Sequence, residues 1–139
     1  KDTAGPWRIH FFQRAAEDDP ARSVPAIQFL EGLTTKVAAE IHAVLAAVAM
    51  APPPSFSGGG KWEAMHGEMA GFYEVRVQGG GMNHRLFCVL ERDAKDLGGS
   101  SIICIEGFSK SQRTAASARE YRRVKRYRDE FKKRRTVVE

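Results

Sequence analysis

A buried strand that ends in positive charge constrains this chain more than any other stretch. Ile102–Ile105 is an uninterrupted apolar run rich in β-branched side chains, and it follows the glycine- and serine-rich segment 98–101. A short apolar run bounded by turn residues favours a central β-strand over a helix. Lys110 and Arg113 come where this strand ends. Because a strand edge is rigid, cations there are well placed to hold a phosphate group.

Positive charge is concentrated in the C-terminal part of the chain. The 139 residues carry a formal charge of +5. Residues 110–139 contain twelve Lys or Arg against four Asp or Glu, so the remainder of the chain is slightly acidic. This asymmetry suggests a polyanion or an acidic partner for the C-terminal part, although a solvated helix face is the plain alternative.

Length and composition predict one domain over residues 1–139, with a real core. Cys88 and Cys104 both lie in apolar runs without zinc or disulfide-framework spacing, so we expect free, buried thiols in a reducing compartment. No apolar run reaches the length of a membrane span and no signal peptide is recognisable, which favours a cytoplasmic protein that binds no membrane. The histidines are scattered, so the sequence predicts neither a metal site nor a cofactor.

The hydrophobic pattern predicts an α+β fold. We expect strands at 7–12, 72–77, 84–91 and from 102 onward, a short strand or turn at 62–65, and helices at 25–32 and from Thr34 or Thr35 onward. Pro52–Pro54 would end the second helix, and Ser57–Gly60 would form a flexible turn. Consecutive late strands with short links imply an antiparallel sheet of about four strands, with the N-terminal helical hairpin on one face.

A basic helix is predicted over about 114–135. Residues 117–120 fit a capping box, so the helix begins near Thr114 or near Ser117. One side of the helix is mostly apolar, and it carries Ala118, Tyr121, Val124 and Phe131. We expect that side to pack on the body of the protein or on a partner, while the other sides present Arg and Lys.

Several short motifs, taken in their order along the chain, resemble the RelE/ParE toxin superfamily and especially its HigB-type, phage-derived branch. After the helical hairpin they are Lys61–Trp62, Phe72–Arg76, His84–Phe87, Ile105–Lys110 and Arg113–Thr114. That branch typically shows a lysine-containing turn, a "Leu-Tyr-Glu-Leu-Arg"-like strand, an arginine-led apolar strand and a "Gly-Phe-x-Lys-Lys" strand end. Ser111 stands here in place of the second lysine of that strand end.

The resemblance implies a RelE-like fold and a small toxin of a type II toxin–antitoxin system. Many members of the superfamily cleave mRNA, usually on the ribosome. We therefore expect an mRNA interferase, a hydrolase that acts as an endoribonuclease without a metal ion. Its partners would be mRNA, the ribosome and a cognate antitoxin of the helix-turn-helix kind. Two alternatives stay open: a ParE-like toxin that inhibits gyrase, and a non-enzymatic RNA- or DNA-binding protein whose functional element is the basic helix.

The expected catalytic residues follow from the chemistry of metal-independent RNA cleavage. This reaction needs a base for the 2′-hydroxyl, positive charge for the phosphorane and an acid for the leaving 5′-oxygen. Arg76 and Arg85 are expected to bind the scissile phosphate from neighbouring strands. Lys110, on a third strand, would add charge or transfer a proton. His66 is the expected general base or acid, because imidazole titrates near neutral pH.

Further contacts with RNA are expected from cations and a histidine around this centre. They are Lys61, His84, Arg113, Arg119, Arg122, Arg123 and Arg126. Plainer interpretations stay open as well. Arg76 would pair with Glu74 or Glu106, the other strand cations would be ordinary edge charge, and His66 would be a solvated loop residue.

Overall fold

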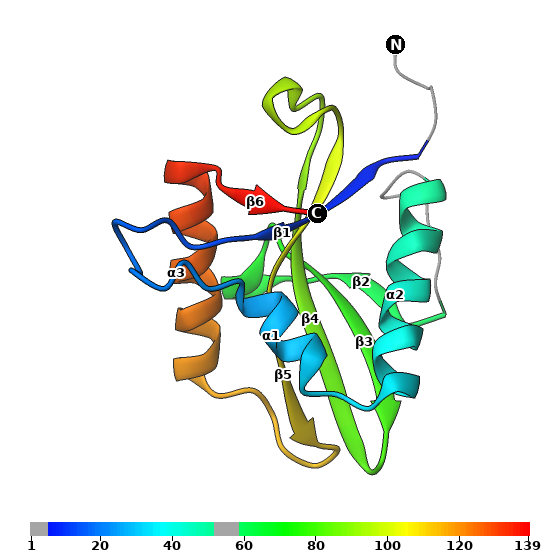
Figure 1. Cartoon of the computed structure of the whole chain (residues 1–139). Coiled ribbons are helices and arrows are strands. Elements are labelled where there is room, and N and C mark those ends of the chain that lie inside the picture. The colour runs from blue at the N-terminus through cyan, green and yellow to red at the C-terminus, as the bar shows by residue number, and fades with distance from the viewer. Residues whose placement is uncertain (1–5, 52–58) are drawn as a thin grey trace.

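One mixed β-sheet lies between two layers of helix (Figure 1). The computed structural model describes residues 6–51 and 59–139. Within these ranges the strands are β1 (Arg8–Phe12), β2 (Trp62–Ala64), β3 (Tyr73–Gly79), β4 (Met82–Glu91), β5 (Ser101–Ser111) and β6 (Val137–Val138). The helices are α1 (Pro25–Glu31), α2 (Thr35–Met50) and α3 (Ala118–Arg134), with short 3₁₀ turns η1 (Gly67–Met69) and η2 (Lys95–Leu97).

The predicted α+β class is confirmed, but the sheet is larger and less regular than predicted. Its strand order is β2-β3-β4-β5-β1-β6 over the described residues. β2 to β5 are antiparallel neighbours, whereas β1 pairs with β5 in parallel and with β6 antiparallel. The predicted antiparallel sheet of about four strands therefore differs from the observed one in strand number and in the parallel pairing of β1 with β5. Strand periodicity does not report pairing partners, and a two-residue strand such as β6 carries no periodicity at all.

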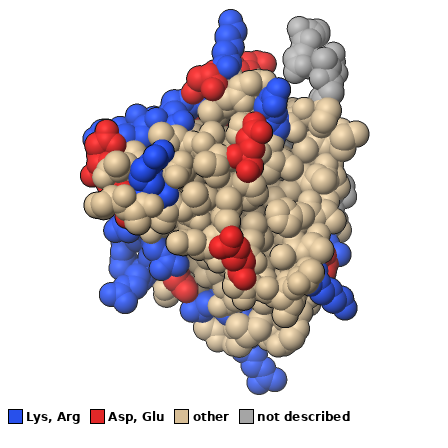
Figure 2. Space-filling model, in the orientation of Figure 1, with Lys and Arg blue, Asp and Glu red and all other residues tan. Residues whose placement is uncertain are grey.

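α1 and α2 cover one face of the sheet. The Thr34 hydroxyl caps α2 by accepting the backbone N–H of Val37 at 3.2 Å, and the predicted apolar face of this helix is buried in the core. In this view uncharged surface predominates over the middle of the molecule, and Lys and Arg lie mainly around its rim (Figure 2). The prediction for Pro52–Pro54 concerns residues outside the described ranges, as does the first half of that for Ser57–Gly60, while residues 59 and 60 lie in a turn. None of the helices in these ranges has the length and apolar character that crossing a membrane requires.

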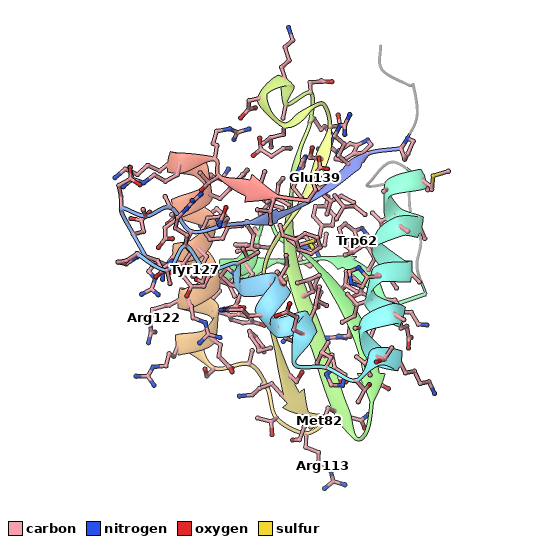
Figure 3. The ribbon with its side chains drawn as sticks, viewed as in Figure 1. Trp62, Met82, Arg113, Arg122, Tyr127 and Glu139 are labelled. Carbon is pink, nitrogen blue, oxygen red and sulfur yellow. The ribbon has the colours of Figure 1, made fainter. Side chains whose placement is uncertain are left out.

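α3 covers the opposite face. It begins after Ser117, where the predicted capping box is complete: Ser117 accepts the backbone N–H of Glu120, and Glu120 accepts that of Ser117. Val124, Tyr127 and Phe131 are buried in a second core against the sheet. Tyr127 lies on the inner side of α3, while Arg122 points away from the body (Figure 3). The predicted packing side is thus confirmed for most of the helix, although Ala118 is exposed.

α1 lies so close to β5 that one position there must be glycine. A Cβ atom built on Gly107 would stand 2.4 Å from Cδ2 of Phe29 on α1 and 2.8 Å from the carbonyl oxygen of Arg85. Neither neighbour is a flexible chain end that could move aside at little cost. Gly107 therefore lets the helix approach the sheet directly above the strand that carries the predicted site.

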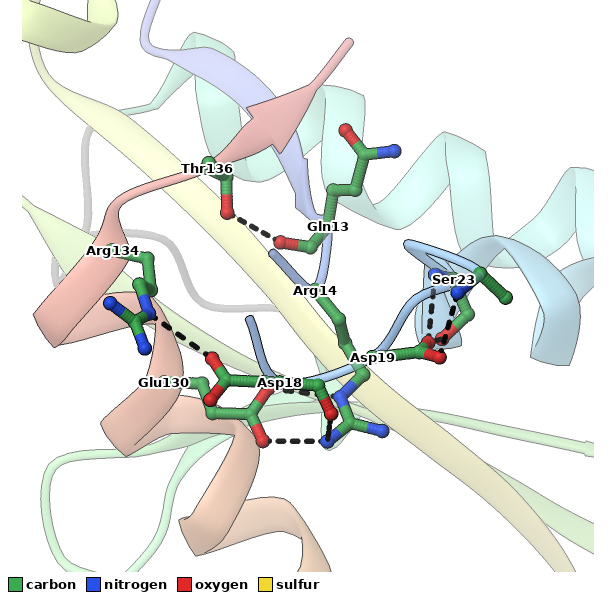
Figure 4. Close-up of polar contacts among 9 residues, drawn as sticks. Gln13, Arg14, Asp18, Asp19, Ser23, Glu130, Arg134 and Thr136 are labelled. Carbon is green, nitrogen blue, oxygen red and sulfur yellow. Dashed lines mark hydrogen bonds and ion pairs between the residues drawn. The ribbon is translucent and has the colours of Figure 1, made fainter. Parts of the chain in front are cut away.

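Ion pairs fasten the C-terminal half of α3 to the loop between β1 and α1 (Figure 4). Arg14 donates to both carboxylate oxygens of Glu130, at 2.9 and 2.8 Å. Arg134 donates from Nε to Asp18 at 3.3 Å. The paired geometry of Arg14 with Glu130 is the kind that contributes more than an isolated surface pair. These contacts fix α3 against the sheet at the end away from the predicted site.

The two cysteines face each other across β4 and β5. Cys88 stands opposite Cys104 in the strand register, and their Sγ atoms are 4.0 Å apart. Both side chains are buried and neither forms a disulfide, so the prediction of free, buried thiols is confirmed. Burial, reinforced by the contact with Cys104, raises the pKa of the Cys88 thiol well above its usual value. The pair is therefore part of the packed core and poorly reactive.

Candidate functional site

Strand register brings the predicted arginines together. Arg76 on β3 stands directly opposite Arg85 on β4, which stands opposite Phe108 on β5. Side chains alternate between the two faces of a sheet, and these three belong to the face covered by α3. Tyr121 of α3 confirms this side, because its hydroxyl accepts a hydrogen bond from Arg85 at 3.2 Å.

A β-bulge brings Lys110 to the same face. Ile103 and Ile105 pack toward α3, so strict alternation would send Lys110 to the opposite side of the sheet. The register shifts between Phe87 and Cys88, because Phe87 pairs with Glu106 while Cys88 pairs with Cys104. Ile105 is the extra residue. After it, Glu106, Phe108 and Lys110 lie on the α3 face beside Arg85.

The four predicted cations of this region line one cavity. It has a volume of about 480 Å³ and lies between the ends of the strands, the segment after β5 and the start of α3. Its lining residues are Arg76, Asn83, Arg85, Lys110, Gln112, Arg113, Thr114, Ala115, Ala116 and Tyr121. The structure therefore joins three strand residues and Arg113 into one polar, positively charged hollow that opens to solvent.

Arg85 is the most enclosed of these cations. Its side chain is 12% exposed, and its Nε lies 2.6 Å from Oε1 of Glu74. The guanidinium also lies over the rings of Phe87, Phe108 and Tyr121, between 5.1 and 6.0 Å from their centres. Burial alone would lower the pKa of Arg85, but the hydrogen bond and charge of Glu74 outweigh burial and raise it. Arg85 is thus held charged and in a fixed orientation.

Arg76 and Lys110 are more accessible. The Arg76 side chain is 44% exposed and lies 3.7 Å from Oε2 of Glu74. Lys110 lies 3.2 Å from the Glu120 carboxylate. Burial raises the pKa of Glu120, but the hydrogen bonds from Ser117 and Lys110 outweigh it, and the pKa is lowered overall. Glu120 is therefore an ionised partner of Lys110.

The charges in and around the cavity do not balance. Four cations line it, whereas two carboxylates, Glu74 and Glu120, contact them. Arg113 is exposed and has no ion-pair partner within residues 6–51 and 59–139. An excess of positive charge in a hollow with fixed donors is the arrangement that binds phosphate groups.

The structure does not bring His66 and His84 to this cavity. His66 is exposed, precedes η1 and is absent from the lining. His84 is buried on the opposite face, where its Nδ1 lies 2.7 Å from the Ser109 hydroxyl and its Nε2 3.1 Å from the Gly79 carbonyl oxygen. Alternation along β4 explains the second case: Arg85 faces α3, so its neighbour faces the other way. A contact of His84 with RNA at this cavity is therefore excluded by its position.

The remaining predicted RNA contacts fall into two classes. Lys61 is paired with Glu40 of α2 at 2.9 Å, and Arg123 with Glu106 at 3.1 Å. Arg119, Arg122 and Arg126 are exposed on α3. Because Lys61 and Arg123 already pair with carboxylates of the protein, they are less suited to bind phosphate. Arg119, Arg122 and Arg126 are accessible, as the prediction of RNA contacts requires.

Two residues that shape the cavity are predicted from the sequence only in other roles, as an ion-pair partner and as a packing residue. Glu74 fixes Arg85 and contacts Arg76, so the alternative interpretation of Arg76 as an ion-pair partner of Glu74 is also realised. Tyr121 contributes a hydroxyl to the lining, although its position on the apolar side of the helix suggested packing only. The sequence did carry a signal for Glu74, because Glu74 and Arg76 are two residues apart on one strand and therefore share a face. No sequence signal distinguishes a packed tyrosine from one at the edge of a cavity.

Comparisons of the chain with protein-family models, curated proteins and solved structures found no match. The described residues also contain no group of three or more His, Cys, Asp or Glu side chains arranged to hold a metal ion.

Proposed function

We propose that this chain is an endoribonuclease of the RelE/HigB toxin type that cleaves mRNA without a metal ion. One observation carries the proposal: Arg76, Arg85 and Lys110 stand on three different strands and line the same solvent-open cavity. Ordinary edge charges have no reason to converge in this way, because like charges directly opposite one another destabilise a sheet. A bound phosphate would relieve that repulsion.

The cavity supplies the charge that RNA cleavage requires. In the proposed reaction the 2′-oxygen attacks the adjacent phosphorus, the bond from phosphorus to the 5′-oxygen breaks, and a 2′,3′-cyclic phosphate and a 5′-hydroxyl result. Negative charge builds up on the phosphorane oxygens. Arg85 is oriented by Glu74 and Tyr121, and the Arg76 side chain is accessible from solvent, so together they are suited to stabilise that charge.

Two protons move in this reaction: one leaves the 2′-hydroxyl and one reaches the 5′-oxygen. Among the lining residues, Lys110 and Tyr121 carry the titratable side chains other than the guanidinium groups. We assign proton transfer to these two side chains in place of His66, which lies outside the lining. Lys110 is paired with Glu120 and Tyr121 accepts from Arg85, so both are oriented by fixed neighbours.

The biological part of the proposal follows from the resemblance. A toxin of this kind would act in the cytoplasm on mRNA at the ribosome, and its cognate antitoxin would neutralise it by covering the cavity or by holding it away from the ribosome. Because the cavity opens to solvent beside the segment after β5, an antitoxin segment carrying acidic residues would fit over it.

The test measures cleavage of a single-stranded RNA and of an mRNA under translation, both in the presence of EDTA. Arg76→Ala removes an accessible side chain and should leave the fold intact, while lowering the cleavage rate by about 10²-fold. Arg85→Ala should lower it at least as far, with folding checked by circular dichroism. Arg22→Ala, at an exposed site in the loop before α1, is the control. Undiminished cleavage by folded Arg76→Ala and Arg85→Ala proteins would refute the proposal.

One observation favours a second function, that of a non-enzymatic nucleic-acid-binding protein. Three of the four cavity cations already have carboxylate partners, at 2.6 to 3.7 Å. Cross-strand pairs of opposite charge such as Glu74 with Arg85 also stabilise a sheet without any ligand. RNA binding without cleavage, unaffected by Arg76→Ala, would support this second function and count against the first.

A further inference from the structure

Seven of the nine cations of α3 fall into two groups with different surroundings. The other two are Arg128, which pairs with its neighbour Asp129, and Lys132, which is exposed. The first group is paired with carboxylates elsewhere in the protein: Arg123 with Glu106, Lys125 with Glu68 and Arg134 with Asp18. These pairs lie at 3.1 to 3.3 Å. They fasten the helix to the sheet and its loops. Their charge is therefore largely neutralised before any partner arrives.

The second group forms one row on the outer side of the helix. We call Arg119, Arg122, Arg126 and Lys133 the outer stripe. Their spacing of three, four and seven residues places them on a single face. All four are exposed, and none has an ion-pair partner in the described parts of the chain. The row is about 21 Å long at 1.5 Å per residue.

The carboxylate nearest to the stripe along the helix is already engaged. Asp129 lies between Arg126 and Lys133 on the same face, and it accepts a hydrogen bond from Nε of Arg128 at 2.7 Å. Arg126 itself lies over the ring of Tyr127, with 5.3 Å between its guanidinium carbon and the ring centre. The stripe thus presents a straight row of uncompensated positive charge on a rigid helix, and such a row matches a regular row of phosphates.

The stripe offers no surface on which bases could stack. The two tyrosines of α3 are turned inward: Tyr127 is buried against Phe12, and the Tyr121 hydroxyl accepts a hydrogen bond from Arg85. Met50 of α2 is the one large apolar side chain that is exposed in the described residues, and it lies on another helix. Proteins that bind single strands without sequence preference combine basic grooves with exposed aromatic rings. A row of charge without rings suits a duplex instead, whose bases are already stacked.

We propose that the outer stripe binds the phosphate backbone of double-stranded RNA. This inference rests on the proposed function, in which RNA is the substrate of the cavity. It adds a second contact outside the cavity, made with duplex RNA. The stripe begins three residues after Ala116, which lines the cavity. A folded RNA would then be held by a duplex segment on α3 while a single-stranded segment enters the cavity.

The test compares two charge-reversed variants in binding a fluorescent RNA duplex of about 16 base pairs, the length that a double-stranded-RNA-binding domain spans. Arg122→Glu/Arg126→Glu changes the stripe. Lys36→Glu/Lys95→Glu alters net charge equally, at exposed lysines of α2 and η2 without ion-pair partners in the described ranges. The stripe variant should bind at least about tenfold more weakly, with a salt slope shallower by about two, since each lost phosphate contact removes about 0.9. The lysine variant should stay close to wild type.

Three results of this comparison would overturn this inference. The first is an equal loss of duplex binding in both variants. The second is binding of single-stranded RNA or of a DNA duplex that is tighter than that of the RNA duplex and is lost in the stripe variant. The third is equally tight binding of poly-glutamate that is lost in the stripe variant. The last result would mark an acidic protein as the partner. Arg76→Ala separates this inference from the proposed function, because it should keep duplex binding while losing cleavage. Duplex binding lost in Arg76→Ala would show that the cavity, and not the stripe, holds the duplex.

Discussion

Arg76 and Arg85 stand directly opposite each other on neighbouring strands, and Glu74 contacts both. Two like charges at such a position repel, so an uncompensated pair would weaken the sheet. Glu74 reaches diagonally across the strand pair to Nε of Arg85 at 2.6 Å, and its other oxygen lies 3.7 Å from Arg76. The negative charge of Glu74 thus offsets the repulsion between the two guanidinium groups and lets them lie close together.

Replacing Glu74 should therefore destabilise the protein. In Glu74→Gln the buried guanidinium of Arg85 keeps a neutral acceptor but loses its counter-charge, and the two arginines repel. We expect the free energy of unfolding to fall by about 1–3 kcal/mol, measured by urea denaturation. Glu63→Gln, at an exposed site on β2, is the matched control and should change it by less than about 0.5 kcal/mol. Equal stability of the two variants would contradict this role of Glu74.

Glu120 should compete with a bound phosphate for Lys110. A phosphate entering the cavity must share Lys110 with the carboxylate that lies 3.2 Å from it. Glu120→Gln removes the competing charge and retains a side chain suited to the capping box. We expect inorganic phosphate to bind about fivefold more tightly, as expected for about 1 kcal/mol in a partly exposed site. Isothermal titration calorimetry would measure the phosphate affinity, with Glu31→Gln as the control. Unchanged or weaker phosphate binding by Glu120→Gln would mean that Lys110 does not bind the phosphate.

The buried carboxyl of Glu106 predicts a specific dependence of stability on pH. Burial raises the pKa of Glu106, and the hydrogen bonds from Gly107 and Arg123 only partly offset this. The folded state therefore holds this proton more tightly than the unfolded state does. Its contribution to stability is full below the ordinary glutamate pKa and is lost as the pH rises through the folded value.

Glu106→Gln removes that titration. The unfolding free energy of the wild type relative to this variant should fall as the pH rises from about 4 to about 7. Glu120→Gln is the control of opposite sign, because the pKa of Glu120 is lowered; there the difference should rise with pH. Urea titrations at several pH values measure both. A difference that rises with pH for Glu106→Gln as well would mean that the pair with Arg123 dominates.

Gly107 should tolerate no side chain. Gly107→Ala would force its Cβ against Phe29 and the backbone of Arg85, at 2.4 and 2.8 Å. We expect a loss of about 1–3 kcal/mol in the free energy of unfolding. Gly32→Ala is the control, because that Cβ would meet its nearest atom at 3.6 Å and the backbone there is ordinary right-handed helix. A fully stable Gly107→Ala protein would show that α1 can shift without cost.

Local sequence signals predicted the elements well and their pairing less well. The apolar face of α2 and the capping box of α3 both follow from side-chain types at fixed spacing, and both are present. The parallel pairing of Ile9 with Ile102 joins residues far apart in the chain, which no local pattern encodes. Because β1 is followed by two helices before the next strand, its partner strand is chosen by the packing of the whole sheet.

The candidate site shows the same division. Arg76 and Arg85 fall on one face because each lies on a strand with regular alternation. Lys110 joins them because of the bulge at Ile105, and alternation alone would have sent it to the other face. The prediction for His66 rests on its residue type alone, because a loop residue has no periodicity from which the direction of its side chain could be read. The residues proposed for proton transfer are therefore the part of the candidate site that sequence patterns predict least.

The position of β1 has a consequence for the order in which the protein folds as it is synthesised. β1 leaves the ribosome before the other described strands, yet its two neighbours in the sheet are β5 and β6, which are made after all the other described strands. Until residue 111 has emerged, β1 has no complete partner strand, and its aromatic residues Phe11 and Phe12 have no finished core to enter. The sheet thus cannot be completed until residue 138 has been made.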